Sequence, residues 1–377
     1  MAEQIYPNLF RIKIPLPERP LKYLNSYIIM GGDRNLIIDT GLNRKECKTA
    51  MMDGLKELNI ELETVDIFIT HLHADHFGLL GELVRKNTTV YFNRPDKELI
   101  EHWEGFEPMI AHAAKNGFPE DMLRQALSEH PGFKYGTDWI PSLNILNDND
   151  ILEIGDYRFT CIQTPGHTEG HTCLYEPDKR FLIAGDHILG DITPNIQCWS
   201  EDSDPLKDYL ESLDKVYPLK VDRVLPGHRR LFENYTQRID ELKHHHELRL
   251  REVVDILVQA SSLSAFEVAS RMKWDIKADS WDDFPIAQKW FATGEAISHL
   301  KYLENKKIIC RDTDDPVVCF SSTSSFTHLL CYKGFAVKSY TFTLYALQMN
   351  ESDLRCKRAN RLTFLPAVLT RLHLCLK

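Results

Sequence analysis

The sequence Thr-His-Leu-His-Ala-Asp-His-Phe-Gly at residues 70–78 decides the fold. An apolar run at 65–69 precedes it and predicts a buried strand, and a helix-like run at 77–84 follows it. The histidines therefore lie at the carboxyl end of a strand, where α/β sheets place their chemistry. Imidazole and carboxylate groups suit Zn, Fe or Mn. A lone His-X-His would more often be a surface feature, but His-X-His-X-Asp-His after a strand predicts a metal site.

A second histidine motif follows the strand predicted at 157–163. Pro165 and Gly166 impose a tight bend, which aims His167 away from the end of that strand. His171 lies four residues further on, and both histidines are able to bind, but metal sites need few ligands. We therefore take His167 as the ligand and His171 as a hydrogen-bonding partner.

Two more predicted strands end in candidate ligands. The strand at 180–186 ends in the carboxylate of Asp186. The strand at 222–228 ends in Pro-Gly-His, so that His228 follows the same kind of bend as the histidine of the second motif. Four strand ends that each deliver ligands argue for one converged site more strongly than any single motif does.

The chain begins with β-structure. Strands predicted at 6–15, 25–30 and 35–39 precede a helix predicted at 44–58. Asp39 ends the third strand. Such an aspartate is either an N-cap or turn residue, or an acceptor that orients a metal-bound imidazole. The sequence leaves both interpretations open.

These motifs resemble the metallo-β-lactamase-fold hydrolase superfamily, across roughly residues 6–232. All seven ligand positions of the family occur in the family's order: His71, His73, Asp75, His76, His167, Asp186 and His228. The resemblance implies an αββα sandwich, with two sheets inside and helices outside. It implies a first metal held by His71, His73 and His167 and a second held by Asp75, His76 and His228. Asp186 would bridge the two metals, and Asp39 matches the family's aspartate behind the ligands.

The ligand set narrows the branch of the family. Zinc β-lactamases typically lack the bridging carboxylate, so Asp186 together with His76 argues against antibiotic hydrolysis. The pattern resembles glyoxalase II, RNase Z and the lactamase-β-like endoribonucleases. The sequence at 185–190 and the helix carrying 244–249 are similar to the last group. The glutathione-binding helices of glyoxalase II do not look reproduced, which puts that substrate in doubt.

The ligand set also predicts a mechanism. Two divalent ions, with Zn as first choice and Fe or Mn as alternatives, would share a hydroxide that attacks an acyl carbonyl or a phosphorus. Asp75 has a free oxygen that would orient this nucleophile or pass a proton. Ser200 and Cys198 have no evident base partner and receive no role. We expect a hydrolase of a small ester or thioester. The alternatives are a metal-dependent endoribonuclease or phosphodiesterase, and a non-enzymatic winged-helix regulator.

Helix-like sequence at 95–133 interrupts the predicted catalytic domain, which spans 1–232. Such an insertion is either a packed helical excursion with its own small core or a lid over the substrate pocket. We favour the packed excursion.

The segment 233–321 has a different character. Helices predicted at 235–260, 265–272 and 286–303 precede a hairpin at 308–320, which is a winged-helix pattern. Winged helices often bind DNA, but residues 235–321 carry twelve Lys or Arg against fifteen Asp or Glu. We therefore expect a role in packing, dimerisation or pocket closure. The run of three histidines at 244–246 is interpreted as a solvated helix face.

Residues 322–377 do not fit the family. They hold eight Lys or Arg and two acids, a net charge of +6, which leaves −16 on the rest of a chain whose total is −10. We interpret this segment as an appended tail uninvolved in catalysis, and a basic tail that contacts RNA or membranes is the alternative. The acidic body disfavours nucleic acid as a partner without excluding it.

The sequence also suggests a location for the protein. No apolar run approaches the roughly 18 residues of a membrane span, and the first residues do not resemble a signal peptide. Nine scattered cysteines without C-x-x-C spacing favour reduced thiols. We expect a cytoplasmic protein that binds a small-molecule substrate and makes no membrane contact. A homodimer is one of the oligomeric states that the sequence allows.

Overall fold

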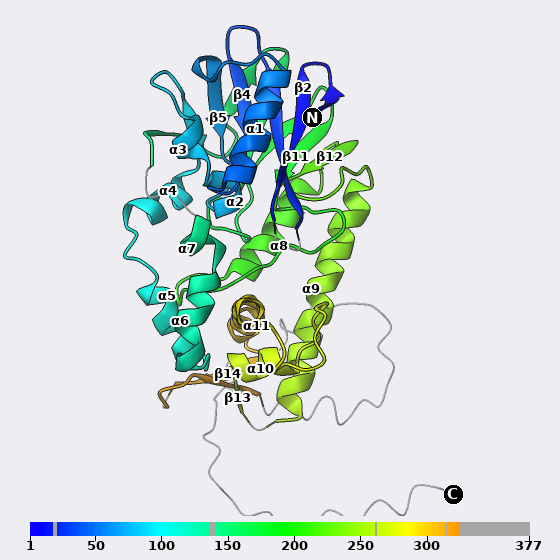
Figure 1. The fold of residues 1–377 in the computed structure, drawn as a ribbon. Coiled ribbons are helices and arrows are strands. Elements are labelled where there is room, and N and C mark those ends of the chain that lie inside the picture. Colours follow the sequence, from blue (N-terminus) through cyan, green and yellow to red (C-terminus); the bar gives the residue numbers. More distant parts are fainter. Residues whose placement is uncertain (18–20, 136–139, 261, 314, 324–377) are drawn as a thin grey trace, which may run out of the picture. The chain divides into compact units, whose positions relative to one another are not determined.

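The structure, a computed structural model, describes residues 1–17, 21–135, 140–260, 262–313 and 315–323. Two mixed β-sheets pack face to face, and helices cover their outer faces (Figure 1). The compact unit Met1–Ser322 contains both sheets. This arrangement agrees with the α/β sandwich expected from the sequence.

The first sheet has seven strands in chain order. They are β1 (Ala2–Tyr6), β2 (Leu9–Pro15), β3 (Tyr23–Met30), β4 (Asn35–Ile38), β5 (Val65–Phe68), β6 (Val90–Phe92) and β7 (Leu143–Ile145). The first four strands pair antiparallel and β4 to β7 pair parallel. The single strand predicted at 6–15 is wrong in part, because Pro7 and Asn8 turn the chain between two strands and Asn8 has a φ of 59°.

The second sheet has five strands in the order β12-β11-β10-β9-β8. They are β8 (Ile151–Ile154), β9 (Tyr157–Gln163), β10 (Thr172–Glu176), β11 (Phe181–Gly185) and β12 (Arg223–Pro226). Only β11 and β12 pair in parallel within this sheet. The three strands predicted before His167, Asp186 and His228 are therefore β9, β11 and β12.

The core of the sandwich follows from the alternation of side chains along each strand. In β4, Leu36 and Ile38 point between the sheets and pack with Phe159 and Ile183 of the second sheet. Ile37 points to the opposite face, where it packs beneath α1 (Lys45–Glu57). Each fully buried side chain of this kind contributes about 1.5–3 kcal/mol. Because a one-residue slip would exchange the two faces, this alternation fixes the strand register that leads to the site.

Short helices follow β5, where a continuous helix is predicted at 77–84. The structure has two single-turn helices instead, α2 (Ala74–Phe77) and α3 (Leu80–Leu83). Gly78 lies between them and packs against the turn after β4, so that a Cβ there would be 2.8 Å from the backbone nitrogen of Asn43. On the second sheet, α8 (Pro205–Val216) is held by a hydrogen bond from Ser212 to the carbonyl of Pro165.

The insertion is helical, as predicted. Its helices are α4 (Arg94–Glu101), α5 (Glu107–Lys115), α6 (Glu120–Glu129) and α7 (Pro131–Tyr135). Its small apolar core is not its own, however, because Phe118 and Leu123 pack around Trp290 of α11 (Ile286–Asn305). The α7 helix lies against α2. The insertion therefore joins the C-terminal helices to the region of the histidine motif.

The C-terminal elements run in the order α9 (Tyr235–Val258), β13 (Leu263–Ser264), α10 (Ala265–Arg271), α11 (Ile286–Asn305), β14 (Ile309–Asp312) and β15 (Cys319–Ser322). The three strands form an antiparallel sheet in the order β13-β15-β14. Ser264 and Glu267 form a capping box that fixes the start of α10. The solvated face predicted for 244–246 is wrong at His246, which is fully buried with its Nδ1 3.2 Å from Nε2 of His299.

Two further expectations meet the structure in part. Among the described residues, no helix has both the length and the apolar character that a membrane span requires. Of the described cysteines, Cys47, Cys161, Cys173, Cys198 and Cys319 are free thiols. Of the tail predicted at 322–377, residues 324–377 lie outside the described residues.

Candidate metal centre

Four loops at the ends of strands deliver the predicted ligands. The loop after β5 carries His71 and His73 and leads into α2, whose first turn holds Asp75 and His76. The second sheet supplies the remaining three: His167 after β9, Asp186 after β11 and His228 after β12. Both sheets therefore end at the same site.

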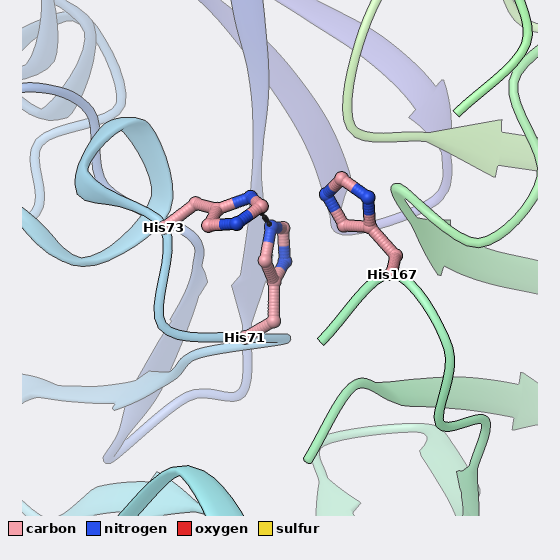
Figure 2. Close-up of side chains that lie close together, drawn as sticks. All are labelled: His71, His73 and His167. Atoms are coloured by element: carbon pink, nitrogen blue, oxygen red, sulfur yellow. Dashed lines mark hydrogen bonds between the residues drawn. The ribbon is translucent and has the colours of Figure 1, made fainter. Parts of the chain in front are cut away.

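The structure brings all seven predicted ligands together in three overlapping groups, within each of which the candidate ligand atoms lie no more than 4.8 Å apart. The groups are His71, His73 and His167; His71, His76 and Asp186; and Asp75, His76 and His228. Figure 2 shows the first group, in which two imidazoles from one loop face a third from the opposite loop. Asp186 approaches both sides, with Oδ2 3.7 Å from His167 Nε2 and 3.3 Å from His228 Nε2.

The donor atoms suit a cation. Nε2 of His76, His167 and His228 and Oδ1 of Asp186 are buried and have no hydrogen-bond partner. Buried polar atoms in proteins are nearly always paired, so a group of unpaired atoms that face one another needs a common partner. A divalent metal ion is such a partner, because neutral imidazole and carboxylate are its usual ligands. The residues therefore fit the metals that the sequence predicts.

The opposite nitrogen of each of these imidazoles is held in place. His167 Nδ1 donates to the carbonyl of Asn195 at 2.9 Å, and His228 Nδ1 donates to the carbonyl of Tyr23 at 2.9 Å. Since a carbonyl only accepts, each contact puts the proton on Nδ1 and leaves the lone pair of Nε2 for a metal. His76 Nδ1 lies 2.8 Å from Oδ2 of Asp39 in the same way.

Asp39 connects the end of β4 to the histidine loop. Its carboxylate accepts hydrogen bonds from the backbone nitrogen of Thr70 at 2.9 Å and from the hydroxyl of the same residue. It caps no helix, because α1 begins after Arg44. Of the two interpretations left open by the sequence, this geometry favours the acceptor that orients an imidazole.

Electrostatics divide the site into two halves. In the first half, burial lowers the pKa of His71, His73 and His167, and neighbouring imidazoles lower the first two further. The pKa of His73 falls to about 3. These three rings are therefore neutral at neutral pH, which is the form that binds metal without first losing a proton.

The second half is charged. Burial alone would lower the pKa of His228, but Asp186 and Asp75 outweigh it and raise that pKa to about 10. The pKa of His76 is likewise raised by Asp39 and Asp186, although burial alone would lower it. Burial alone would raise the pKa of Asp75 and Asp186, but the imidazoles of His76 and His228 hold both pKa values below the usual range. Cations bound here would replace protons, so metal binding releases protons in this half.

Several residues around the ligands were not predicted. Asp96 hydrogen-bonds to both histidine loops, and Asn195 bonds through its side chain to Glu295 of α11 at 2.7 Å. An acid in the first turn of a helix is ordinary, so no signal in the sequence marks Asp96. His171, in contrast, is the hydrogen-bonding partner that the sequence predicts, since its Nε2 accepts from the backbone nitrogen of Asp186 at 3.0 Å.

Comparisons with known proteins agree with this geometry. The model of the Metallo-beta-lactamase superfamily matches residues 20–228, more than half of the chain. A Beta-lactamase-like protein 2 homolog from Caenorhabditis elegans is 26% identical over 298 residues, covering 78% of this chain and 80% of that protein. An acyl-coenzyme A thioesterase from Bos taurus is 25% identical over 222 residues, covering 54% and 72%.

A solved structure is also similar. The crystal structure of a metallo-beta-lactamase family protein from Thermus thermophilus superposes with a TM-score of 0.73 at 27% identity, over 85% of this chain and all of that one. Relatives named as hydrolases and thioesterases argue against a non-enzymatic regulator. With the superfamily model spanning both histidine motifs, we conclude that the chain belongs to the metallo-beta-lactamase superfamily and is a metal-dependent hydrolase.

Proposed function

We propose that the chain hydrolyses a small acyl ester or thioester at a centre of two divalent metal ions, with zinc as first choice. The observation that carries the proposal is the full set of two carboxylates and five imidazoles, several of whose inward atoms have no other partner. Thioesters are preferred because a related protein is an acyl-coenzyme A thioesterase. The branch near glyoxalase II and the endoribonucleases stays a prediction.

The proposed division of ligands follows the two electrostatic halves. His71, His73 and His167 would hold the first cation, Asp75, His76 and His228 the second, and Asp186 would contact both. Such cations supply Lewis acidity, which activates water and polarises an acyl carbonyl.

Asp75 is the proposed catalytic residue of the chain itself. Its side chain is 18% exposed, whereas His228 is fully buried and Asp186 is 8% exposed, so it is the more accessible carboxylate of the site. Its lowered pKa keeps it ionised at neutral pH, so it would accept a hydrogen bond from a water molecule and orient that water for attack. The Oδ2 atom lies 3.4 Å from His228 Nε2, which orients the group.

We also propose that 233–321 is a winged-helix-type domain and that the tail after it takes no part in catalysis. The order of elements from α9 to β15 supports the first proposal. A chain ending at Ser321 should keep the turnover of the full chain, and loss of folding or turnover would refute the second proposal.

Hydrolysis of phosphodiesters in RNA is the second candidate, because the ligand pattern and the order of elements from α9 to β15 resemble those of the lactamase-β-like endoribonucleases. Charge disfavours it, since residues 235–321 carry twelve Lys or Arg against fifteen Asp or Glu.

The test is a substrate screen on the zinc-loaded full chain. Short-chain and long-chain acyl-coenzyme A, a simple aryl ester, an aryl phosphodiester and a short RNA would be compared at equal enzyme concentration. We expect thioesters to give the highest kcat/KM and a chelator to abolish turnover. Faster cleavage of RNA or of the phosphodiester would overturn the substrate proposal.

Two variants connect the activity to the centre. Asp186→Ala should abolish turnover and lose one metal equivalent. Asp191→Ala is the matched control, because this acid follows β11 closely but pairs with Arg230 at the surface. It should keep both metals and full turnover. Turnover that survives Asp186→Ala would mean that the chemistry lies elsewhere.

A further inference from the structure

We propose that Asp96 is a positioning residue. It sets the distance between the loop that carries His71 and His73 and the loop that carries His167, the three ligands of the proposed first metal. The inference rests on the metal centre of the proposed function but concerns metal binding and not the substrate. Asp96 lies in the first turn of α4, within the inserted segment and outside the predicted ligand set.

The carboxylate of Asp96 contacts both loops at once. Oδ2 accepts from the backbone nitrogen of Leu72 at 3.0 Å, and Leu72 lies between His71 and His73. The same oxygen accepts from the hydroxyl of Thr168 at 3.2 Å, directly after His167.

The other oxygen completes the connection. Oδ1 of Asp96 accepts from the backbone nitrogen of Gly170 at 2.9 Å. Asp96 is 1% exposed, so each of these bonds is shielded from water and from competition by it. The side chain of Asp96 thus joins Leu72 in the first loop to Thr168 and Gly170 in the second.

The carboxylate is itself fixed by the start of α4. Asn93 is the N-cap of this helix, and its Oδ1 accepts from the backbone nitrogen of Asp96 at 2.8 Å while its Nδ2 lies 3.2 Å from Oδ2 of Asp96. Gly170 packs so closely on this cap that a Cβ would clash with Oδ1 of Asn93. The loop that carries His167 therefore packs closely against the N-terminus of α4.

A carboxylate suits this position better than its amide would. All four partners of Asp96 are donors: two backbone N–H groups, one amide and one hydroxyl. An asparagine would turn its own NH₂ group towards some of these donors, leaving N–H facing N–H. Although burial raises the pKa of Asp96 to about 6, the group is ionised at neutral pH and accepts from all four.

Loop spacing matters because metal–ligand distances tolerate only about 0.2 Å of variation. His73 and His167 come from different loops, and their ring centroids are 4.5 Å apart. A backbone hydrogen bond from Thr172 to Thr70 at 2.9 Å joins the loops near the strand ends. Asp96 supplies a second joint, beside the ligands themselves, so the two joints together define the relative position of the three imidazoles.

The test compares Asp96→Asn with Asp66→Asn in the full chain. Asp66 is a second buried aspartate that joins two segments, since it pairs with Arg34 and accepts from Thr89 at 2.8 Å, but it contacts neither histidine loop. Zinc affinity would be measured by competition with a chromophoric chelator. The visible spectrum of the Co²⁺-loaded protein would report the ligand geometry, and thermal unfolding in chelator would report stability without metal.

We expect Asp96→Asn to weaken one of two zinc equivalents by about 10- to 100-fold and to alter the Co²⁺ spectrum. Asp66→Asn should lower the melting temperature in chelator and leave both zinc affinities unchanged. If Asp96→Asn lowers only the melting temperature and keeps wild-type zinc affinity, its role is merely structural and the proposal fails.

A gentler variant guards against a failure to fold. Thr168→Val removes one donor to Asp96 at nearly constant volume, and we expect a smaller loss of affinity for the same zinc equivalent. Unchanged affinity in that variant, with Asp96→Asn unfolded, would also count against the proposal. If the wild type binds two zinc ions and hydrolyses no thioester, the proposed function fails while the role of Asp96 still stands.

Discussion

A non-glycine residue adopts a positive φ only where its surroundings hold it there, and Asp39 has a φ of 58°. The contacts that hold it are those to Thr70 and His76. Aspartate tolerates this conformation better than most residues do because its short polar side chain bonds locally. The strained backbone thus places an acceptor behind a predicted ligand, and the contact decides which nitrogen of that imidazole carries the proton.

This geometry makes a prediction for Asp39→Asn. Asparagine tolerates the backbone conformation, so the protein should fold. If the amide NH₂ faces Nδ1 of His76, that nitrogen must accept, and the proton moves to Nε2, where it blocks metal binding. We expect the second zinc equivalent to bind about 10- to 100-fold more weakly, as measured by titration against a chelator. The first equivalent serves as the internal control, and equal weakening of both would contradict this tautomer argument.

At the same scale, the metal ligands could be predicted from the sequence, but the residues that hold these ligands in place could not. His71, His167 and His228 follow apolar strands at bends, and this local pattern survives in the sequence. Asp96 differs from any other acid in the first turn of a helix only through partners at 72 and 168–170. His246 was misinterpreted for the same reason, since its burial depends on a contact with His299, far along the chain. Hydrogen bonds between distant segments leave no local periodicity.

At the scale of elements, α11 is connected to the metal centre through one hydrogen-bonded path. Glu295 of α11 is 8% exposed and accepts from Nδ2 of Asn195, whose backbone carbonyl accepts a hydrogen bond from Nδ1 of His167. Arg249 of α9 lies 3.7 Å from the other oxygen of Glu295. The C-terminal helices therefore support a ligand that belongs to the second sheet, which gives them a structural role at the site in addition to packing.

Replacing Glu295 tests this path. In Glu295→Ala the side chain of Asn195 loses its acceptor. Arg249 loses its ion pair but keeps its hydrogen bonds to Glu252 and Lys273 and its cation–π contact with Trp274. We expect a loss of about 1–3 kcal/mol in the free energy of unfolding, measured by urea denaturation, together with weaker binding of the zinc held by His167. Glu247→Gln removes surface pairs with Arg251 and His244, far from Glu295 in the chain, and should change neither quantity. Reduced stability with unchanged zinc affinity would show that α11 does not support the metal centre.

The insertion and the C-terminal hairpin are also joined by a charged contact. Glu201 accepts from Arg311 of β14 at 2.6 and 2.7 Å and from Lys115 of α5 at 3.2 Å. The hydrogen bonds from Arg311 contribute most to lowering the pKa of Glu201, from 4.5 to about 2. A lowered pKa means that the folded state binds fewer protons, so the contribution is complete above about pH 4.5 and is lost as the pH falls to about 2.

Glu201→Gln should therefore destabilise the protein only where the carboxylate is charged. Because Glu201 is 38% exposed, we expect a modest loss near neutral pH, about 0.2–1 kcal/mol, as for a partly solvated ion pair. Urea unfolding of wild type and variant across acidic pH measures the difference, which should shrink as the pH falls through the window from about 4.5 to 2. A difference that stays constant through this range would show that the charge of Glu201 is not responsible.

At the scale of the whole molecule, the candidate centre lies where the two sheets meet. The loop after β5 of the first sheet supplies His71, His73, Asp75 and His76, and the second sheet supplies His167, Asp186 and His228. Near the centre, Asn25 of β3 and Gly227 after β12 form one of the direct links between the sheets, a backbone hydrogen bond of 2.7 Å. Cations held by ligands from both sheets would therefore fasten the sandwich together at this end.

Metal removal should consequently lower the stability of the entire sandwich and not only of one loop. A ligand that binds only the folded state at 100 times its Kd adds about 2.7 kcal/mol to the free energy of unfolding. We expect chelator to lower the unfolding midpoint of wild type as seen by both far-ultraviolet circular dichroism and tryptophan fluorescence, with the two probes still coincident. Restoring zinc should restore the midpoint, whereas Asp186→Ala, which lacks the carboxylate near both halves, should recover only part of it. Identical midpoints with and without chelator would mean that the seven side chains do not bind metal tightly enough to join the sheets.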